Sequence, residues 1–344
     1  MHEPSSSTVR VAAVQATPAF LDRDATIDKA CDLIAEAGRN GAELAVFPEG
    51  FVPTYPFWTW FVPPHRTKEL RPLYDALLRA AITVPGPNVD RLGRAAREAG
   101  VAVVMGANER DAEGTDATLY NALLFIGSDG RLLGRHRKLV PTVAERMVHG
   151  RGDGSTLNVY DLAFARVAGL ICWENYMPLA RWALYPRGVQ ILAAPTWDRG
   201  EPWNSTLRHV AKEGRAFVIG CCSPMRRDDV PSEWGFVRDH VPEGAWINPG
   251  GSAIVDPDGR YLVEPVVETE RILYADLDMS VLRGSRYQLD VAGHYARPDV
   301  FDFAVRDGAR STTHGVPPVV DGRDRSERPD REPVSPVDGA LEGG

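Results

Sequence analysis

The chain has 344 residues, of which 44% are hydrophobic and 25% are charged, and its formal net charge is -8. This composition is typical of a globular protein with a large core, and an acidic chain without a dense Lys/Arg run is not expected to bind nucleic acid. No stretch approaches the roughly 18 apolar residues of a membrane span, and the N-terminus does not resemble a secretory signal, so we expect a cytoplasmic protein with no membrane partner.

The first part of the chain alternates strand-like and helix-like segments. Residues 9–15 are a Val- and Ala-rich run that predicts a strand, and apolar residues recur at helical spacing between 24 and 38. Residues 42–48 and 101–109 predict two more buried strands. Two apolar runs around a Ser-Asp-Gly turn within 119–134 predict a hairpin.

The same alternation continues in the second part. Strands are predicted at 165–172, 189–195, 216–222 and 272–278, helices from Pro178 and over 207–214, and a hairpin at 252–265. Strands buried on both faces that alternate with helices favour an α/β fold in which helices cover a mixed sheet.

We expect a single domain over residues 1–308, because no linker-like composition divides the first three hundred residues. From 309 to 344 the chain is rich in Gly, Pro, Asp and Arg and shows little apolar periodicity. That composition predicts a disordered or loosely docked tail.

Four cysteines, without a CxxC pair or a Cys/His cluster, make a zinc site improbable, so no metal is expected. Cys221 and Cys222 are neighbours in an apolar run, where successive residues point to opposite faces of a strand. They are predicted to be buried, reduced thiols. Cys172 therefore has to be judged on its surroundings.

Two predicted strands end at residues that could act in catalysis, one as a general base and one as a nucleophile. Glu49 follows the apolar run 42–48, where partial burial would raise its pKa toward that of a general base. Cys172 ends the run 165–172 and precedes a helix that starts with Pro178, and a sharp strand-to-helix turn can expose a nucleophile. Each has an ordinary alternative, because Glu49 could cap a helix or lie on the surface and Cys172 could be a small buried hydrophobe.

Other candidates are weaker in isolation. Lys138 lies in a long charged connection, where a lysine is usually solvated, and Glu145 follows it in the same segment. His294 could act as a base, but it is one of eight histidines.

Three separated motifs together favour a catalytic role for these residues. FPEGF, HRKLVPT and ICWEN resemble the motifs of the nitrilase superfamily of carbon-nitrogen hydrolases. The superfamily's Glu, Lys and Cys fall on Glu49, Lys138 and Cys172, and the resemblance spans roughly residues 9–300. CWEN followed by MPLAR, and PTxxER after the lysine, resemble the nitrilase branch, whereas amidase branches generally have Tyr-Asp after the cysteine.

The resemblance implies a four-layer α-β-β-α sandwich of mixed sheets and a homo-oligomer, either a dimer or a longer spiral. It implies no cofactor and no metal, and it makes Glu145 a second glutamate near the thiol. His149 is a departure, because nitrilases often have Trp in this segment.

The implied reaction is hydrolysis of an organic nitrile to an acid and ammonia through a thioimidate and a thioester on Cys172. Tyr55, Trp58, Trp173 and Trp197 are expected to bind the substrate. Three alternatives stay open: a cyanide hydratase, cyanide dihydratase or amidase of the same superfamily, a Cys-His hydrolase, and a catalytically silent assembly protein. The Cys-His alternative would use one of three histidines, His136, His149 or His294.

Overall fold

The structure is a computed structural model, and it describes residues 8–112 and 115–308. The predicted tail, residues 309–344, lies outside the described residues, and the single domain over 1–308 stays a prediction. No helix in the described part is long and apolar enough to cross a membrane.

Six strands form the first sheet, in the order β13-β1-β2-β3-β4-β5. They are β13 (Arg271–Asp278), β1 (Thr8–Gln15), β2 (Leu44–Val46), β3 (Ala102–Arg110), β4 (Leu119–Ile126) and β5 (Leu132–Arg137). β1, β2 and β3 are parallel neighbours, whereas β13, β4 and β5 pair antiparallel with their neighbours. The sheet is therefore mixed, and β4–β5 is the predicted hairpin.

Seven strands form the second sheet, in the order β10-β11-β9-β8-β7-β6, with β12 paired to β11. They are β10 (Pro224–Arg226), β11 (Trp246–Val255), β9 (Phe217–Cys222), β8 (Ile191–Thr196), β7 (Arg166–Gly169), β6 (Tyr160–Asp161) and β12 (Tyr261–Val267). β7, β8 and β9 are parallel, and the other pairs are antiparallel. The second sheet is mixed as well.

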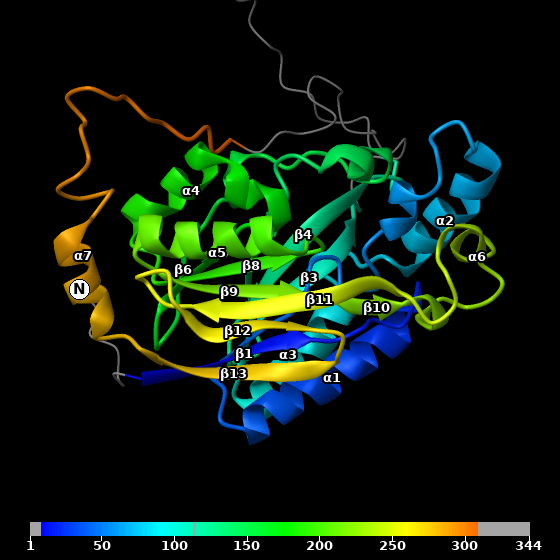
Figure 1. Cartoon of the computed structure of the whole chain (residues 1–344), viewed down its shortest axis with the longest axis horizontal. Helices are drawn as coiled ribbons and strands as arrows, with labels where there is room; N and C mark the ends of the chain where they lie inside the picture. Colours follow the sequence, from blue (N-terminus) through cyan, green and yellow to red (C-terminus); the bar gives the residue numbers. More distant parts are fainter. Residues whose placement is uncertain (1–7, 113–114, 309–344) are drawn as a thin grey trace, which may run out of the picture. The chain divides into compact units, whose positions relative to one another are not determined.

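Helices cover the outer face of each sheet, and Figure 1 shows α1 on one side of the strands and α4 and α5 on the opposite side. The helices are α1 (Arg23–Arg39), α2 (Thr67–Ala80), α3 (Pro87–Ala99), α4 (Pro178–Leu184), α5 (Glu201–Gly214), α6 (Phe236–His240) and α7 (Val281–Gln288). In α1, the side chain of Asp22 accepts a hydrogen bond from the Ala25 N–H at 3.0 Å, which caps the first turn.

Alternation along the strands separates three of the four apolar clusters in the described part of the chain. Val11 of β1 and Ile191 of β8 belong to one cluster between the two sheets. Ala12 packs with side chains of α1 and α3 on the outer face of the first sheet, and Leu192 packs with α4 and α5 on the outer face of the second. Because a strand's side chains alternate between faces, this arrangement is the predicted α-β-β-α sandwich.

The structure adds elements that the sequence patterns did not predict, among them α2 and α3. α2 contains Pro72, which interrupts a helical pattern. α3 begins at Pro87, where proline is favoured, and ends before Gly100, which has a left-handed φ of 68°. The two thiols of β9 are as predicted: Cys221 and Cys222 are free and buried, and Cys221 faces the core between the sheets.

Candidate functional site

Glu49 lies three residues beyond β2 and is 1% exposed. Its Oε1 accepts hydrogen bonds from the Asn121 amide and the Lys138 ammonium, both at 2.8 Å, and its Oε2 accepts one from the Trp197 N–H at 2.7 Å. Burial raises the pKa of Glu49 to about 7, although Lys138 acts in the opposite direction. The carboxyl group is thus held in one orientation and titrates near neutral pH.

Lys138 directly follows β5 and its ammonium lies between two carboxylates. Nζ is 2.8 Å from Oε1 of Glu49 and 2.9 and 2.8 Å from the two oxygens of Glu145, and all three side chains are buried. Burial alone would lower the pKa of Lys138, but the charges of Glu49 and Glu145 raise it above its usual value. Lys138 is therefore a cation at neutral pH.

Glu145 lies in the 3₁₀ turn η2 (Val143–Met147), where its side chain is fixed from several directions. Besides Lys138, it accepts hydrogen bonds from the Tyr55 hydroxyl at 2.7 Å and from the Thr142 N–H at 3.0 Å. Burial favours the neutral acid, but the Lys138 cation outweighs it and lowers the pKa of Glu145. Glu145 is thus the ionised member of the carboxyl pair, and Glu49 is the member that can take up a proton.

Cys172 begins the 3₁₀ turn η4 (Cys172–Tyr176), three residues after β7. Its φ of 51° is unusual for a residue other than glycine, so the turn is locally strained. The Asn175 amide holds the turn through hydrogen bonds to the carbonyls of Leu170 and Cys172, both 2.9 Å. Burial first, and then the charge of Glu49, raise the pKa of the Cys172 thiol, so the resting sulfur is protonated.

Thr196, the last residue of β8, contacts the sulfur directly. Its Oγ1 is 3.1 Å from Sγ of Cys172 and accepts a hydrogen bond from the Asp198 N–H at 2.8 Å. Because the hydroxyl oxygen already accepts from Asp198, its own proton is free to point at the sulfur.

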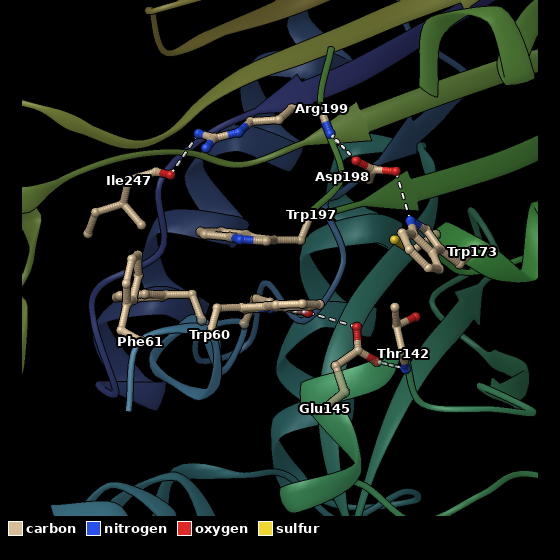
Figure 2. A pocket seen from close by; sticks show the side chains of 12 residues that line it. Trp60, Phe61, Thr142, Glu145, Trp173, Trp197, Asp198, Arg199 and Ile247 are labelled. Carbon is tan, nitrogen blue, oxygen red and sulfur yellow. Dashed lines mark hydrogen bonds between the residues drawn. The ribbon is translucent and has the colours of Figure 1, made fainter. Parts of the chain in front are cut away.

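A cavity of about 380 Å³ reaches the thiol of Cys172. Figure 2 shows Phe61, Trp60 and Trp197 on one side of the cavity and Thr142, Glu145 and Trp173 on the other. Its walls are Tyr55, Phe57, Trp60, Phe61, Thr142, Glu145, Cys172, Trp173, Trp197, Asp198, Arg199 and Ile247. The sulfur is therefore open to a pocket with mostly apolar walls and polar groups near the thiol.

Three of the four aromatic residues expected to bind substrate line this cavity. Trp197 stacks on Tyr55 with ring centroids 4.8 Å apart, and the Trp173 indole donates to Asp198 at 2.8 Å (Figure 2). Trp58 is different, because it is buried and lines a second cavity of about 450 Å³ instead. The structure thus gives no support for Trp58 as a wall of the pocket at Cys172.

The histidines of the alternative Cys-His mechanism have other partners. His136 contacts Glu174 and Thr156 through its two ring nitrogens, and Nε2 of His149 is 2.8 Å from Oδ1 of Asn108. His294 is exposed, and its ring contacts Tyr295. Burial lowers the pKa of His149 to about 4, so that ring is neutral at physiological pH.

Sequence reasoning missed three groups that contact Glu49 or the thiol: the Asn121 amide and the Trp197 N–H at Glu49, and the Thr196 hydroxyl at Cys172. A signal existed for Asn121, because it is a lone polar residue in the apolar run of β4. Within residues 8–112 and 115–308, no group of three or more His, Cys, Asp or Glu side chains is arranged to hold a metal ion.

The carbon-nitrogen hydrolase family matches residues 10–287, and the chain therefore belongs to this family of hydrolases that act on carbon-nitrogen bonds. The bifunctional nitrilase/nitrile hydratase NIT4B of Nicotiana tabacum is 42% identical over 92% of this chain and 89% of its own length. The aliphatic nitrilase of Sinorhizobium fredii (strain HH103) is 43% identical over 88% of this chain and 97% of its own length. Within the family, the chain lies in the nitrilase branch, as its motifs predicted.

Solved structures support the fold. Nit3 of Saccharomyces cerevisiae, a member of branch 10 of the nitrilase superfamily, superposes with a TM-score of 0.67 at 21% identity, covering 86% of this chain and 100% of that one. A carbon-nitrogen hydrolase of Helicobacter pylori superposes with a TM-score of 0.65 at 18% identity, covering 86% of this chain and 97% of that one. The predicted fold class is confirmed.

Proposed function

We propose that this protein is a nitrilase that hydrolyses an organic nitrile to a carboxylic acid and ammonia, with Cys172 as nucleophile and Glu49, Lys138 and Glu145 as its charged partners. The observation that carries the proposal is the thiol at the end of an apolar cavity, beside a lysine held between two carboxylates. The relatives that are named nitrilases over most of their length support it.

The first step is addition of the Cys172 sulfur to the nitrile carbon. Because the resting thiol is protonated, Glu49 takes the proton as the C–S bond forms, and its pKa of about 7 suits that transfer. The nitrile nitrogen becomes negative and takes this proton from Glu49, which gives a neutral thioimidate and leaves Glu49 ionised for the next step. The Lys138 cation favours this step by stabilising the developing negative charge.

Water completes the reaction in two stages. Glu49 removes a proton from the first water, which adds to the thioimidate carbon, and the resulting tetrahedral species loses ammonia to leave a thioester. A second water hydrolyses the thioester to the acid and returns the thiol. If the tetrahedral species expels the sulfur instead of ammonia, the product is the amide, a second product class suggested by relatives named nitrile hydratases as well as nitrilases.

The cavity favours an organic nitrile over cyanide. Cyanide has no apolar part to bury, whereas Tyr55, Trp173 and Trp197 among the walls offer ring faces to a hydrocarbon group. At about 380 Å³ the cavity falls within the range of small-molecule sites. We therefore propose a mid-sized apolar nitrile as the substrate.

A substrate panel tests the function. Ammonia, amide and acid are measured from benzonitrile, an aliphatic nitrile, cyanide and a simple amide. We expect acid and ammonia from an organic nitrile at a higher kcat/KM than from cyanide or the amide. Turnover of the amide alone would make the protein an amidase, and turnover of cyanide alone would make it a cyanide hydratase or dihydratase.

Thr196 offers a test of how the sulfur is activated. Thr196→Val keeps the shape of the side chain and removes the hydroxyl, whereas Thr196→Ser keeps the hydroxyl. A hydrogen bond to a charged group contributes about 1.5–3 kcal/mol, so loss of the hydroxyl should destabilise the Cys172 thiolate. Cys172 of the valine variant should therefore react with iodoacetamide at about one tenth of the wild-type rate or less. The serine variant should stay near wild type, and equal rates in both variants would show that the hydroxyl does not act on the sulfur.

Assembly and location complete the proposal. The homo-oligomer implied by the family resemblance is checked by sedimentation velocity. The cytoplasmic location expected from the N-terminal sequence stays a prediction.

A further inference from the structure

Glu174 is a buried carboxylate two residues after the thiol, and the reaction scheme does not use it. It lies in η4 and is 1% exposed. Its Oε2 accepts a hydrogen bond from the Ile171 N–H at 2.7 Å, and its Oε1 accepts one from the Leu139 N–H at 2.7 Å. Nε2 of His136 lies 3.1 and 3.0 Å from the two oxygens.

The two backbone donors are the immediate neighbours of the proposed reacting groups. Ile171 precedes Cys172, and Leu139 follows Lys138. Lys138 directly follows β5 of the first sheet, whereas Cys172 follows β7 of the second sheet. The Glu174 carboxylate therefore links the two sheets, because it contacts the residue after Lys138 at the end of β5 and the residue before Cys172 beyond β7.

We propose that Glu174 is a positioning residue that fixes Lys138 relative to Cys172, and that His136 is the partner that holds its carboxylate in place. The inference rests on the proposed function, because it assigns Glu174 a part in the same reaction. It concerns geometry, since the hydrogen bonds of Glu174 go to two backbone N–H groups and to His136 rather than to the reacting side chains.

The contacts explain why a carboxylate stands here. Its two oxygens each accept from a backbone N–H on a different chain segment and also face His136. Although burial disfavours the charged form, His136 and the two N–H groups lower the pKa of Glu174, so it remains an acceptor at both oxygens. An amide side chain has one acceptor oxygen, and its NH₂ group would face either the Ile171 or the Leu139 N–H.

His136 is itself held on its other side. Its Nδ1 is 3.2 Å from Oγ1 of Thr156, which also accepts a hydrogen bond from the Arg137 N–H at 3.3 Å. Because His136 and Arg137 belong to β5, this contact ties the end of β5 to the turn η3 (Gly154–Thr156). His136 therefore acts on the site through Glu174, and its effect should depend on Glu174.

The test is Glu174→Gln, measured by nitrile turnover and by the alkylation of Cys172 with iodoacetamide. Because a displacement near 1 Å between reacting groups can cost about 10²-fold in rate, we expect kcat to fall by about that factor. The cavity walls are unchanged, so KM should change by less than kcat does. The alkylation rate should fall as well, because the position of the sulfur relative to its charged partners is what changes.

A matched variant separates positioning from a general loss of stability. Asp258→Asn makes the equivalent acid-to-amide change at a carboxylate in the turn between β11 and β12, which pairs with the buried Arg215 at 2.7 Å. We expect it to lower the thermal midpoint while leaving kcat and the alkylation rate near wild type. If Glu174→Gln behaved in this way, the positioning role would be overturned.

His136→Gln and the double variant complete the test. If His136 acts through Glu174, kcat of the double variant should equal that of Glu174→Gln alone, whereas independent effects would multiply and contradict the inference. Should Glu174→Gln fail to fold, a slower alkylation of Cys172 in His136→Gln would support the inference, and an unchanged rate would overturn it. Because alkylation needs no nitrile, failure of the proposed function would appear separately, as absent turnover in the wild type.

Discussion

Replacing Cys172 with alanine should abolish the release of ammonia and acid from every nitrile that the wild type converts. The scheme has no second nucleophile, since each later step occurs on a carbon bonded to this sulfur. Loss of an essential nucleophile in other hydrolases costs on the order of 10⁶ in kcat. Colorimetric detection of ammonia and mass spectrometry of the intact protein after mixing with substrate would measure turnover and the covalent adduct together.

The change should leave the fold intact. Alanine tolerates the φ of 51° at this position about as well as cysteine does, and the removed sulfur lies beside an existing cavity. Cys221→Ala is the matched control, because it removes a thiol that is 0% exposed in the core between the sheets. The control should be less stable yet active. Ammonia release by Cys172→Ala at the wild-type rate would eliminate the thiol mechanism.

The sequence was sufficient to single out Glu49, Lys138 and Cys172 as candidates, because each lies in one of the three motifs. It could not show that the ammonium of Lys138 lies between two carboxylates, since Glu49 is 89 residues away in the chain. The same holds for Glu174, whose contact with Leu139 joins residues 35 apart. Such contacts are set by the way the two sheets pack, which local patterns do not record.

Trp58 shows a different limit. The segment Phe57–Trp60 is a 3₁₀ helix, in which side chains three residues apart lie on the same face. Phe57 and Trp60 accordingly both line the cavity at Cys172, whereas Trp58 lines the second cavity. Composition indicated an aromatic wall, but choosing its members needed the helical geometry of four residues.

Replacing Lys138 with methionine should be among the most damaging changes for stability as well as for activity. Methionine has nearly the same length, so the main loss is the charge that separates Glu49 from Glu145. Breaking a buried pair by removing one partner costs about 3–5 kcal/mol, which would lower the thermal midpoint by about 5–15 °C. The loss of electrostatic stabilisation should also reduce kcat by about 10²-fold or more.

Lys29→Met is the matched control. Lys29 pairs with Glu270 at 2.7 Å, but both side chains are well exposed, at 37% and 45%. Exposed pairs contribute about 1 kcal/mol or less, so this variant should lose little stability and keep its activity.

The pH dependence of Lys138→Met follows from the two carboxyl groups that remain. Without the cation, burial raises the pKa of both Glu49 and Glu145 above the unfolded value of about 4.3. As the pH rises above that value, the unfolded chain releases protons that the folded variant retains, so the variant loses stability up to its raised folded pKa values. In the wild type only Glu49 has a raised pKa, of about 7, so one carboxyl group rather than two loses stability as the pH rises. Glu145 has a lowered pKa there and contributes stability above about pH 4.3, which acidification removes. The difference in thermal midpoint between the two proteins should therefore be largest near neutral pH and should become smaller toward pH 4. A difference that grew on acidification would contradict the arrangement of one cation between two acids.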